Sequence, residues 1–362
     1  MAKSKRIEKL RVSMGEKSLD AFLVTSDENR HYFSGFRGSA GYLWITESNS
    51  FLITDFRYTE QAAIQAPDYE IIRLASQFDW LKEVIDTSKV FRVGFEDFNL
   101  PVSTFNSIVH EIQNLSAKIE LIPTSSLADE IRSIKEPEEI QLLTEAILIA
   151  DRAMEAVSMQ IRPGMTEREI SWMMERTMRE NGADALSFDT IVASGPNGAK
   201  PHHKPTDRKL DYGDGVTIDM GALYDGYCSD ITRTFVLGKA NDKFREVYDT
   251  VLSAMETAES TAIAGMTGKE IDSLARNVID KSGYGDSFGH SLGHGIGVAV
   301  HEYPRVGPNS NNQLIENGMV FSIEPGIYLT GWGGVRIEDL VVMEGGHPRV
   351  LTTAHKNELI EL

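Results

Sequence analysis

Residues 164–170 read GMTEREI, and residues 265–271 read GMTGKEI. Each copy places a glutamate three residues after a threonine, which is the pattern of a capping box at the start of a helix. The two predicted helices stop at glycines, Gly182 in the first copy and Gly283 in the second. The two copies are about 100 residues apart. This period is too long, and two copies are too few, for a solenoid. We therefore expect two related halves that face each other across one sheet.

An acid repeats in step with each predicted helix. Residues 217–221 read TIDMG and residues 322–326 read SIEPG, so one apolar run ends at Asp219 and the other at Glu324. A further strand-like run follows each of them and carries its own acid, Asp230 or Glu338. Four carboxylates on four apolar strands are costly to bury unless a positive charge lies among them. The acids therefore predict a metal site.

The first acid pair flanks a hairpin signal, YDGY, at residues 224–227. A turn centred on residues 224 and 225 would set Asp219 directly opposite Asp230, whereas a turn at residues 225 and 226 would make them diagonal neighbours. Both registers put the two carboxylates on one face, because side chains alternate along a strand with period two. Two like charges this close require a cation between them or a proton on one of them.

Histidines accumulate near the acids. Residues 289–297 read GHSLGHGIG and contribute His290 and His294, and His301 follows shortly. His202 precedes the first acid in the segment PHHKP. One such residue alone is usually structural, but buried acids and histidines seldom gather without partners. We interpret the combination as a functional site.

The length, net charge and cysteine content of the chain exclude several classes of protein. At 362 residues the chain is long enough for two domains. Its net charge of −18 argues against nucleic acid or an anionic membrane as a partner. No apolar run approaches the ~18 residues of a transmembrane helix, and the one cysteine allows no intrachain disulfide. We therefore expect a cytoplasmic protein.

Two domains are expected, at residues 1–125 and 126–362. The first alternates helical and strand-like patterns, which indicates an α/β domain. Its predicted helices cover residues 4–17 and 56–66, and its predicted strands cover residues 21–25, 51–54 and 69–74. Residues 125–136 carry few strand signals and lead to Pro137, which suits the first turn of a long helix.

Five of these residues resemble the ligand set of the superfamily that contains methionine aminopeptidase, aminopeptidase P, prolidase and creatinase: Asp219, Asp230, His294, Glu324 and Glu338. Residues 34–41 (SGFRGSAG), 54–58 (TDFRY) and 333–339 (GGVRIED) are similar to the short bacterial aminopeptidase P branch. The resemblance covers nearly the whole chain. It implies an α/β, creatinase-like N-terminal domain followed by a pseudo-twofold α+β catalytic domain of the "pita-bread" type.

The resemblance also implies a dinuclear metal centre. Asp219 would bind one metal, Asp230 and Glu338 would bridge both, and His294 and Glu324 would complete the other. Four carboxylates and one imidazole form a hard ligand set that favours Mn²⁺, with Co²⁺, Fe²⁺ and Zn²⁺ as alternatives. Five ligands are too many for one tetrahedral metal, and a hydroxide between two metals is the expected nucleophile.

Further roles follow from the same resemblance. Glu324 is also the expected general base, which passes the proton of the attacking water to the leaving nitrogen. The other expected roles are polarisation of the scissile carbonyl by His301, contact with the leaving proline nitrogen by His202, and a place in the proline pocket for His290. Arg336 lies two residues before Glu338 and is expected to orient it or the substrate carboxylate. His203 competes with His202 for its role.

The expected function is a dinuclear metallo-aminopeptidase that hydrolyses the Xaa-Pro bond at the amino terminus of peptides. Prolidase, which cleaves Xaa-Pro dipeptides, is the alternative. A metal-free, creatinase-like amidine hydrolase and a non-catalytic peptide-binding homologue are rivals that the intact ligand set disfavours. The expected partners are peptides with proline in the second position, with no nucleic acid and no membrane. We also expect a homodimer or higher homo-oligomer, in which a symmetry mate helps to close the pocket.

Overall fold

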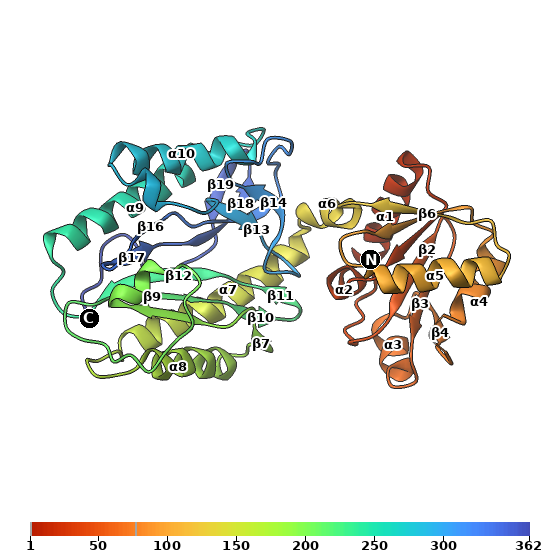
Figure 1. Cartoon of the computed structure of the whole chain (residues 1–362), viewed down its shortest axis with the longest axis horizontal. Coiled ribbons are helices and arrows are strands. Elements are labelled where there is room, and N and C mark those ends of the chain that lie inside the picture. The colour runs from red at the N-terminus through yellow and green to blue at the C-terminus, as the bar shows by residue number, and fades with distance from the viewer. Residues whose placement is uncertain (1, 77) are drawn as a thin grey trace. The chain divides into compact units, whose positions relative to one another are not determined.

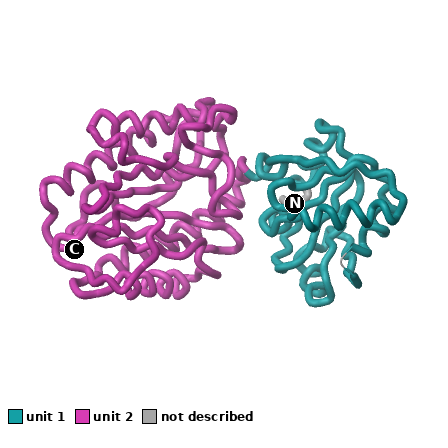
Figure 2. Tube along the Cα trace, in the orientation of Figure 1, with its two compact units in different colours: residues 1–132 teal, residues 133–362 magenta. Residues whose placement is uncertain are grey.

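The computed structural model describes residues 2–76 and 78–362. The chain divides into two compact units, residues 1–132 and 133–362 (Figure 2). Helix α6, Leu127–Ser133, occupies the segment in which the sequence showed few strand signals. Within the described ranges, no helix combines the length and apolar character that a membrane span requires.

The first unit is built around a mixed six-stranded sheet with the order β4-β3-β2-β1-β5-β6 (Figure 1). The β1–β5, β5–β6 and β3–β4 pairs are parallel, and β1–β2 and β2–β3 are antiparallel. The predicted α/β domain is thereby confirmed. The strands are β1 Ala21–Val24, β2 Tyr42–Thr46, β3 Ser50–Thr54, β4 Glu70–Arg73, β5 Arg92–Glu96 and β6 Glu120–Thr124, and the helices are α1 Ala2–Glu16, α2 Asp27–Ser34, α3 Thr59–Gln65, α4 Trp80–Ser88 and α5 Val102–Asn114.

One predicted helix of this unit begins later than expected. The pattern predicted a helix from residue 56, but α3 starts at Thr59. The Asp55 carboxylate accepts hydrogen bonds from the backbone N–H of Arg57 at 2.9 Å and from its guanidinium at 2.9 and 2.7 Å. An aspartate that bonds the backbone two residues on forms a turn that competes with the helix. The side chain of Phe56 is 67% exposed in this turn rather than part of an apolar helix face.

The second unit consists of two helix pairs on opposite sides of its strands (Figure 1). Helix α7 has proline in its first turn, as the sequence predicted, and it also has a capping box of Glu136 and Glu139. The helices are α7 Pro137–Ser158, α8 Glu167–Glu180, α9 Asp242–Thr261 and α10 Gly268–Lys281, with 3₁₀ turns η1 Gly195–Ala199 and η2 Gly285–Ser287. The strands are β7 Ala185–Leu186, β8 Ile191–Ser194, β9 Gly215–Met220, β10 Ala222–Tyr224, β11 Tyr227–Cys228, β12 Ile231–Val236, β13 Gly293–Gly295, β14 Glu302–Val306, β15 Val320–Ile323, β16 Gly326–Leu329, β17 Gly333–Arg336, β18 Asp339–Glu344 and β19 His347–Val350.

The two halves repeat in detail. Both predicted capping boxes are present, at Thr166 for α8 and at Thr267 for α10. The chain just before each box also pairs with a later segment, because Leu210 donates to the carbonyl of Met165 at 2.9 Å and Ile315 donates to that of Met266 at 2.8 Å. One hydrophobic core lies under α7 and α8 and a second under α9 and α10. The predicted pseudo-twofold arrangement is confirmed. The expectation of one shared sheet was wrong, because the described strands of this unit pair into four separate sheets: β11-β10-β7, β12-β9-β8, β14-β13-β15-β18-β19 and β16-β17.

The central strands hold the acids in a defined register. Leu223 pairs with Cys228 and Tyr224 with Tyr227, so the first hairpin turns at residues 225 and 226. Asp225 and Gly226 have φ angles of 47° and 85°, which the tight turn requires and which glycine and aspartate tolerate. Asp219 therefore pairs with Thr232 and is a diagonal neighbour of Asp230, the second of the two registers that the sequence allowed.

Candidate metal centre

The predicted ligands come from corresponding places in the two halves. Asp219 lies on β9, and Asp230 immediately precedes β12, the strand paired with β9. Glu324 follows β15 directly, and Glu338 precedes β18, the strand paired with β15. His294 is the middle residue of β13, which also pairs with β15. Each half thus supplies two acids from neighbouring strands, and the second half adds the imidazole.

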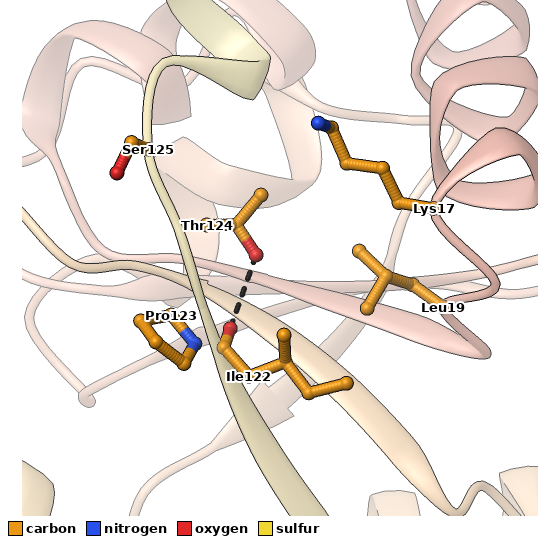
Figure 3. A pocket seen from close by; sticks show the side chains of 6 residues that line it. All are labelled: Lys17, Leu19, Ile122, Pro123, Thr124 and Ser125. Atoms are coloured by element: carbon orange, nitrogen blue, oxygen red, sulfur yellow. Dashed lines mark hydrogen bonds between the residues drawn. The ribbon is translucent and has the colours of Figure 1, made fainter.

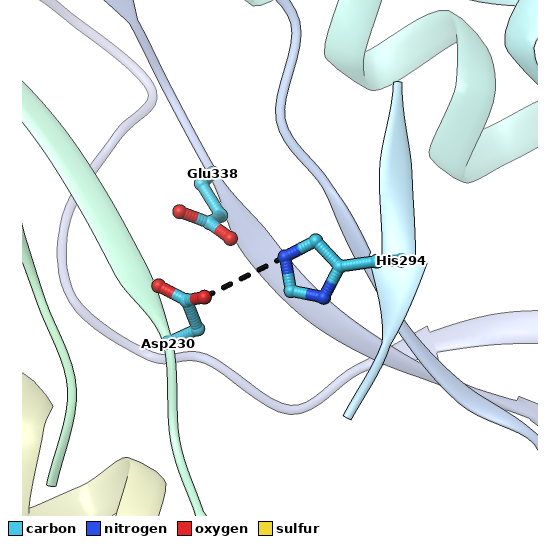
Figure 4. A group of neighbouring side chains, drawn as sticks. All are labelled: Asp230, His294 and Glu338. Atoms are coloured by element: carbon cyan, nitrogen blue, oxygen red, sulfur yellow. Dashed lines mark ion pairs between the residues drawn. The ribbon is translucent and has the colours of Figure 1, made fainter. Parts of the chain in front are cut away.

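Three of these side chains converge on one point. Asp230, His294 and Glu338 each offer one ligand atom, and these atoms all lie within 4.8 Å of one another (Figure 4). The Nε2 atom of His294 lies 3.7 Å from Asp230 Oδ2 and 3.3 Å from Glu324 Oε1. Its other ring nitrogen, Nδ1, lies 3.1 Å from the carbonyl oxygen of Gly295, so Nδ1 carries the proton. A neutral His294 therefore directs the Nε2 lone pair at carboxylate oxygens.

Asp219 is held by Arg336. Arg336 Nη2 donates to Asp219 Oδ2 at 2.6 Å, and its Nε donates to Thr232 Oγ1 at 3.1 Å. Thr232 in turn donates to Glu338 Oε2 at 2.7 Å. Arg336 thus contacts Asp219 directly and is linked to Glu338 through Thr232, while its predicted role of orienting Glu338 or the substrate carboxylate stays a prediction.

The electrostatics of the cluster favour either a bound cation or protons on some of its carboxylates. Burial, followed by repulsion from the neighbouring carboxylates, raises the pKa of both Asp230 and Glu338 well above the ordinary range. Burial also raises the pKa of Glu324 and lowers that of His294. Among the described residues, Asp219 Oδ1 and Glu338 Oε1 are buried without a hydrogen-bond partner. Such orphaned oxygens are rare unless an ion satisfies them. The hard oxygen and nitrogen donors fit one or two divalent metals.

Two further predicted histidines border this cluster. His290 Nδ1 lies 2.8 Å from the carbonyl oxygen of Ser291, and its Nε2 lies 2.9 Å from Tyr328 Oη. The rings of His294 and His301 meet edge to face with centroids 4.2 Å apart. Burial and the neighbouring His294 and His202 lower the pKa of His301 to about 4. His301 is therefore neutral at pH 7 and can donate a hydrogen bond to a carbonyl oxygen.

The structure separates the adjacent histidines His202 and His203. The side chain of His203 is buried, and its Nε2 lies 2.8 Å from Glu167 Oε2. His202 is exposed, and it is close enough to His301 to contribute to the shift of its pKa. Only His202 is therefore available to a substrate, and His203 has a different partner.

Several residues of the site escaped the sequence analysis. Thr232 could have been found, because it lies two residues after Asp230 and so on the same strand face. Tyr328 carried no comparable signal. The sequence also carried no sign of the buried ion pair between Lys135 and Glu302, the residue after His301. Lys135 Nζ lies 2.7 Å from Glu302 Oε1. Glu167 was visible only as a difference between the two copies of the repeated motif.

A pocket elsewhere in the chain has a different character. It encloses about 400 Å³ in the first unit and is lined by Lys17, Leu19, Ile122, Pro123, Thr124 and Ser125 (Figure 3). The Thr124 hydroxyl is bonded within the segment itself, to the carbonyl oxygen of Ile122 at 3.0 Å. The lining holds one charged side chain and no group of metal ligands, so we assign it no role in the chemistry.

Sequence profiles of two known families match the chain. The profile described as "Metallopeptidase family M24" matches residues 141–344. The profile described as "Creatinase/Prolidase N-terminal domain" matches residues 6–134. All five predicted ligands lie within the first of these matches.

Solved structures and characterised relatives are similar over almost the full length. The structure of an Xaa-Pro dipeptidase from Bacillus anthracis is 42% identical, with a TM-score of 0.94 over 99% of this chain and 100% of that one. An X-Pro aminopeptidase from Thermotoga maritima is 40% identical, with a TM-score of 0.90 over 98% and 99%. The Xaa-Pro dipeptidase of Pyrococcus furiosus is 38% identical over 96% of this chain and 98% of that protein.

Proposed function

The chain belongs to metallopeptidase family M24, and from this premise we propose that it is a metal-dependent peptidase that hydrolyses Xaa-Pro bonds. The observation that carries the proposal is the buried cluster of carboxylates around the Nε2 atom of His294. Relatives named for both Xaa-Pro dipeptidase and X-Pro aminopeptidase activity support the substrate class. The proposed ligands are Asp219, Asp230, His294, Glu324 and Glu338.

Two divalent metal ions, with Mn²⁺ favoured, would supply Lewis-acid activation of water and of the scissile carbonyl. Glu324 would act as the general base. Burial raises its pKa, which brings a carboxylate closer to the range in which it can accept and return a proton near neutral pH. Its Oε1 atom accepts a hydrogen bond from Ser322 at 3.1 Å, which fixes the orientation of the carboxylate.

The histidines would bind and orient the peptide. Neutral His301 would donate to the carbonyl oxygen of the scissile bond, and exposed His202 would lie near the leaving proline nitrogen. His290 would line the proline pocket together with Tyr328. Because Nδ1 of His290 faces a carbonyl oxygen, its Nε2 accepts from Tyr328 Oη, which holds both rings in place.

Of the two specificities, we propose the aminopeptidase first and the dipeptidase as the alternative. A dipeptidase must recognise the free carboxylate of the proline, and Arg336 was the predicted partner for that group. Its guanidinium is paired with Asp219 at 2.6 Å, which supports recognition of peptides that continue beyond proline. The single cysteine supports a cytoplasmic location. The homo-oligomer stays a prediction.

Hydrolysis of an Xaa-Pro dipeptide and of the matching Xaa-Pro-Xaa tripeptide should be compared with Mn²⁺ present and after chelation. We expect the tripeptide to be cleaved with the higher kcat/KM, and chelation to abolish both activities. A peptide with alanine in the second position serves as the control and should resist cleavage. Preference for the dipeptide would favour the alternative, and activity that survives complete metal removal would contradict the proposed mechanism.

A further inference from the structure

Glu167 and His203 form a buried pair that neither metal binding nor substrate contact explains. We propose that they are positioning residues, which hold the segment 194–206 so that His202 is presented to the substrate. The proposal rests on the role of His202 in the proposed function. Neither residue would touch substrate or metal, so the pair would act only through the segment that it fixes.

The Glu167 carboxylate is the anchor of this segment. The side chain of Glu167 is 0% exposed. Its Oε1 atom accepts from Ser194 N and Oγ, both at 2.8 Å, and from Asn197 Nδ2 at 3.0 Å. Its Oε2 atom accepts from His203 Nε2 at 2.8 Å and from Thr206 N and Oγ1 at 3.0 and 2.7 Å. One carboxylate thus ties together the two ends and the middle of the segment.

The chemistry of the carboxylate defines the role of His203. Burial alone would raise the pKa of Glu167, but the hydrogen bonds from Asn197, His203 and Thr206 lower it to about 2. An ionised carboxylate only accepts hydrogen bonds, so His203 Nε2 must be the donor. A buried His203 that is fixed in this way constrains the backbone of the preceding residue, His202, whose side chain is left exposed.

The opposite side of the segment 194–206 packs against β17, the strand that carries Arg336. A Cβ atom added at Gly198 would lie 2.9 Å from the backbone nitrogen of Gly334, so the two backbones are in close contact. Arg336 Nη1 also donates to the carbonyl oxygen of Pro201 at 3.4 Å. The residue before His202 is therefore tied to the same guanidinium that holds Asp219. The hydrogen-bonded pair of Glu167 and His203, here called the clamp, holds the segment on one side and β17 holds it on the other. His202 is thereby left near His301, whose ring meets that of His294.

In the second half, the corresponding loop is attached to its helix by a glycine rather than by a carboxylate. The place of Glu167 in the repeat is taken there by Gly268, and a Cβ atom at Gly268 would lie 2.0 Å from the carbonyl oxygen of Arg305. The segment that follows His301 therefore docks directly on the helix backbone. Capping does not explain Glu167, because Thr166 and Glu169 form the capping box of α8 by themselves. The difference between the copies marks Glu167 as a residue with a role of its own.

The clamp is tested by comparing His203→Ala with His203→Gln, because the glutamine amide can still donate to Glu167. We expect His203→Ala to lower kcat/KM on the Xaa-Pro-Xaa tripeptide about 10- to 100-fold, as misplacement of a substrate-contacting group does. His203→Gln should recover most of this loss, and both variants should bind as much metal as the unaltered protein. Glu169→Gln is the matched control, since it weakens the same helix start without touching residues 194–206, and its kcat/KM should stay near the original value.

Two further measurements separate the clamp from the proposed function. If His203 acts through His202, the His203→Ala change should have little additional effect in a His202→Ala background. Hydrogen exchange should also accelerate at residues 194–206 in His203→Ala but not in Glu169→Gln. Hydrogen exchange does not depend on turnover. It therefore tests whether Glu167 and His203 hold residues 194–206 even if the unaltered chain cleaves no Xaa-Pro peptide. Unchanged exchange, additive effects of the two histidine changes, or equal damage by alanine and glutamine would each overturn the proposal.

Discussion

At the scale of single residues, the symmetry of the two halves does not extend to chemistry. Asp219 and Glu324 occupy corresponding positions at the ends of central strands. Arg336 neutralises Asp219, whereas Glu324 accepts from Ser322 and lies 3.3 Å from the Nε2 atom of His294. The Oδ2 atom of Asp219 is already occupied by a hydrogen bond from the guanidinium, which leaves it less free to take a proton from water. Glu324 is therefore the better candidate for the base.

We predict that Glu324→Gln retains much of the bound metal but loses most of its turnover. The amide keeps an oxygen for coordination and for the Ser322 hydroxyl, but it cannot take up a proton. A loss of roughly 10²–10⁴-fold in kcat is the usual range for removal of a general base. Metal per chain by elemental analysis and kcat on the tripeptide check the prediction. Turnover near the original value would assign the base elsewhere.

The gathering of acids around His294 could be anticipated from the sequence, but the protein partners of these acids could not. The acids stand out because a buried carboxylate in an apolar strand needs an explanation, and Asp219 and Glu338 show this by their orphaned oxygens. The pairing of Arg336 with Asp219 joins residues 117 positions apart. Only the packing of the two halves brings such groups together. The same limit applied to His203, whose buried partner lies 36 positions away on α8.

At the scale of elements, the predictions were accurate where local rules decide the structure. The capping boxes of α8 and α10, the proline start of α7 and the presence of a hairpin at residues 224–227 depend on a few neighbouring residues, so they could be anticipated. The start of α3 was wrong, because Asp55 engages Arg57 in a competing turn. The hairpin register stayed open in the sequence, since one step along the turn changes the pairing without changing the face of either acid.

A prediction at this scale concerns the attachment of α8 to its loop. Because the folded pKa of Glu167 is lowered to about 2, its ionised form stabilises the fold above the unfolded pKa of about 4.3. This contribution is lost as the pH falls from there through about 2. The shift corresponds to about 3 kcal/mol, so Glu167→Gln should be destabilised by a few kcal/mol at pH 7. Denaturant unfolding of both proteins should show this difference shrinking below about pH 4. A difference that is independent of pH would contradict the assignment.

At the scale of the whole molecule, metal and stability should be coupled. The second unit gathers two buried acids, Asp230 and Glu338, and two half-buried ones, Asp219 and Glu324, whose mutual repulsion a bound cation would relieve. A ligand that binds only the folded state stabilises it by mass action. We predict that chelation lowers the thermal unfolding midpoint and that Mn²⁺ restores it. Glu338→Gln removes one of the repelling charges and replaces one of the two carboxylate oxygens offered to the metal by an NH₂ group, so its midpoint should respond less to Mn²⁺. Calorimetry of both proteins with and without Mn²⁺ measures the effect. An unresponsive midpoint in the unaltered chain would argue against a metal site.

The different anchors of the two loops have a consequence for how such a chain can change over generations. At Gly268 any side chain would collide with the backbone of Arg305. The attachment of the loop that follows His301 therefore cannot change by single substitutions at this position. At Glu167 the attachment is a set of side-chain hydrogen bonds, which substitutions can weaken, rearrange or lengthen one at a time. The loop that carries His202 can therefore accept substitutions more readily than the loop that follows His301. Directed evolution toward new peptide substrates should accumulate its accepted mutations at residues 194–206, and few at residues 302–306.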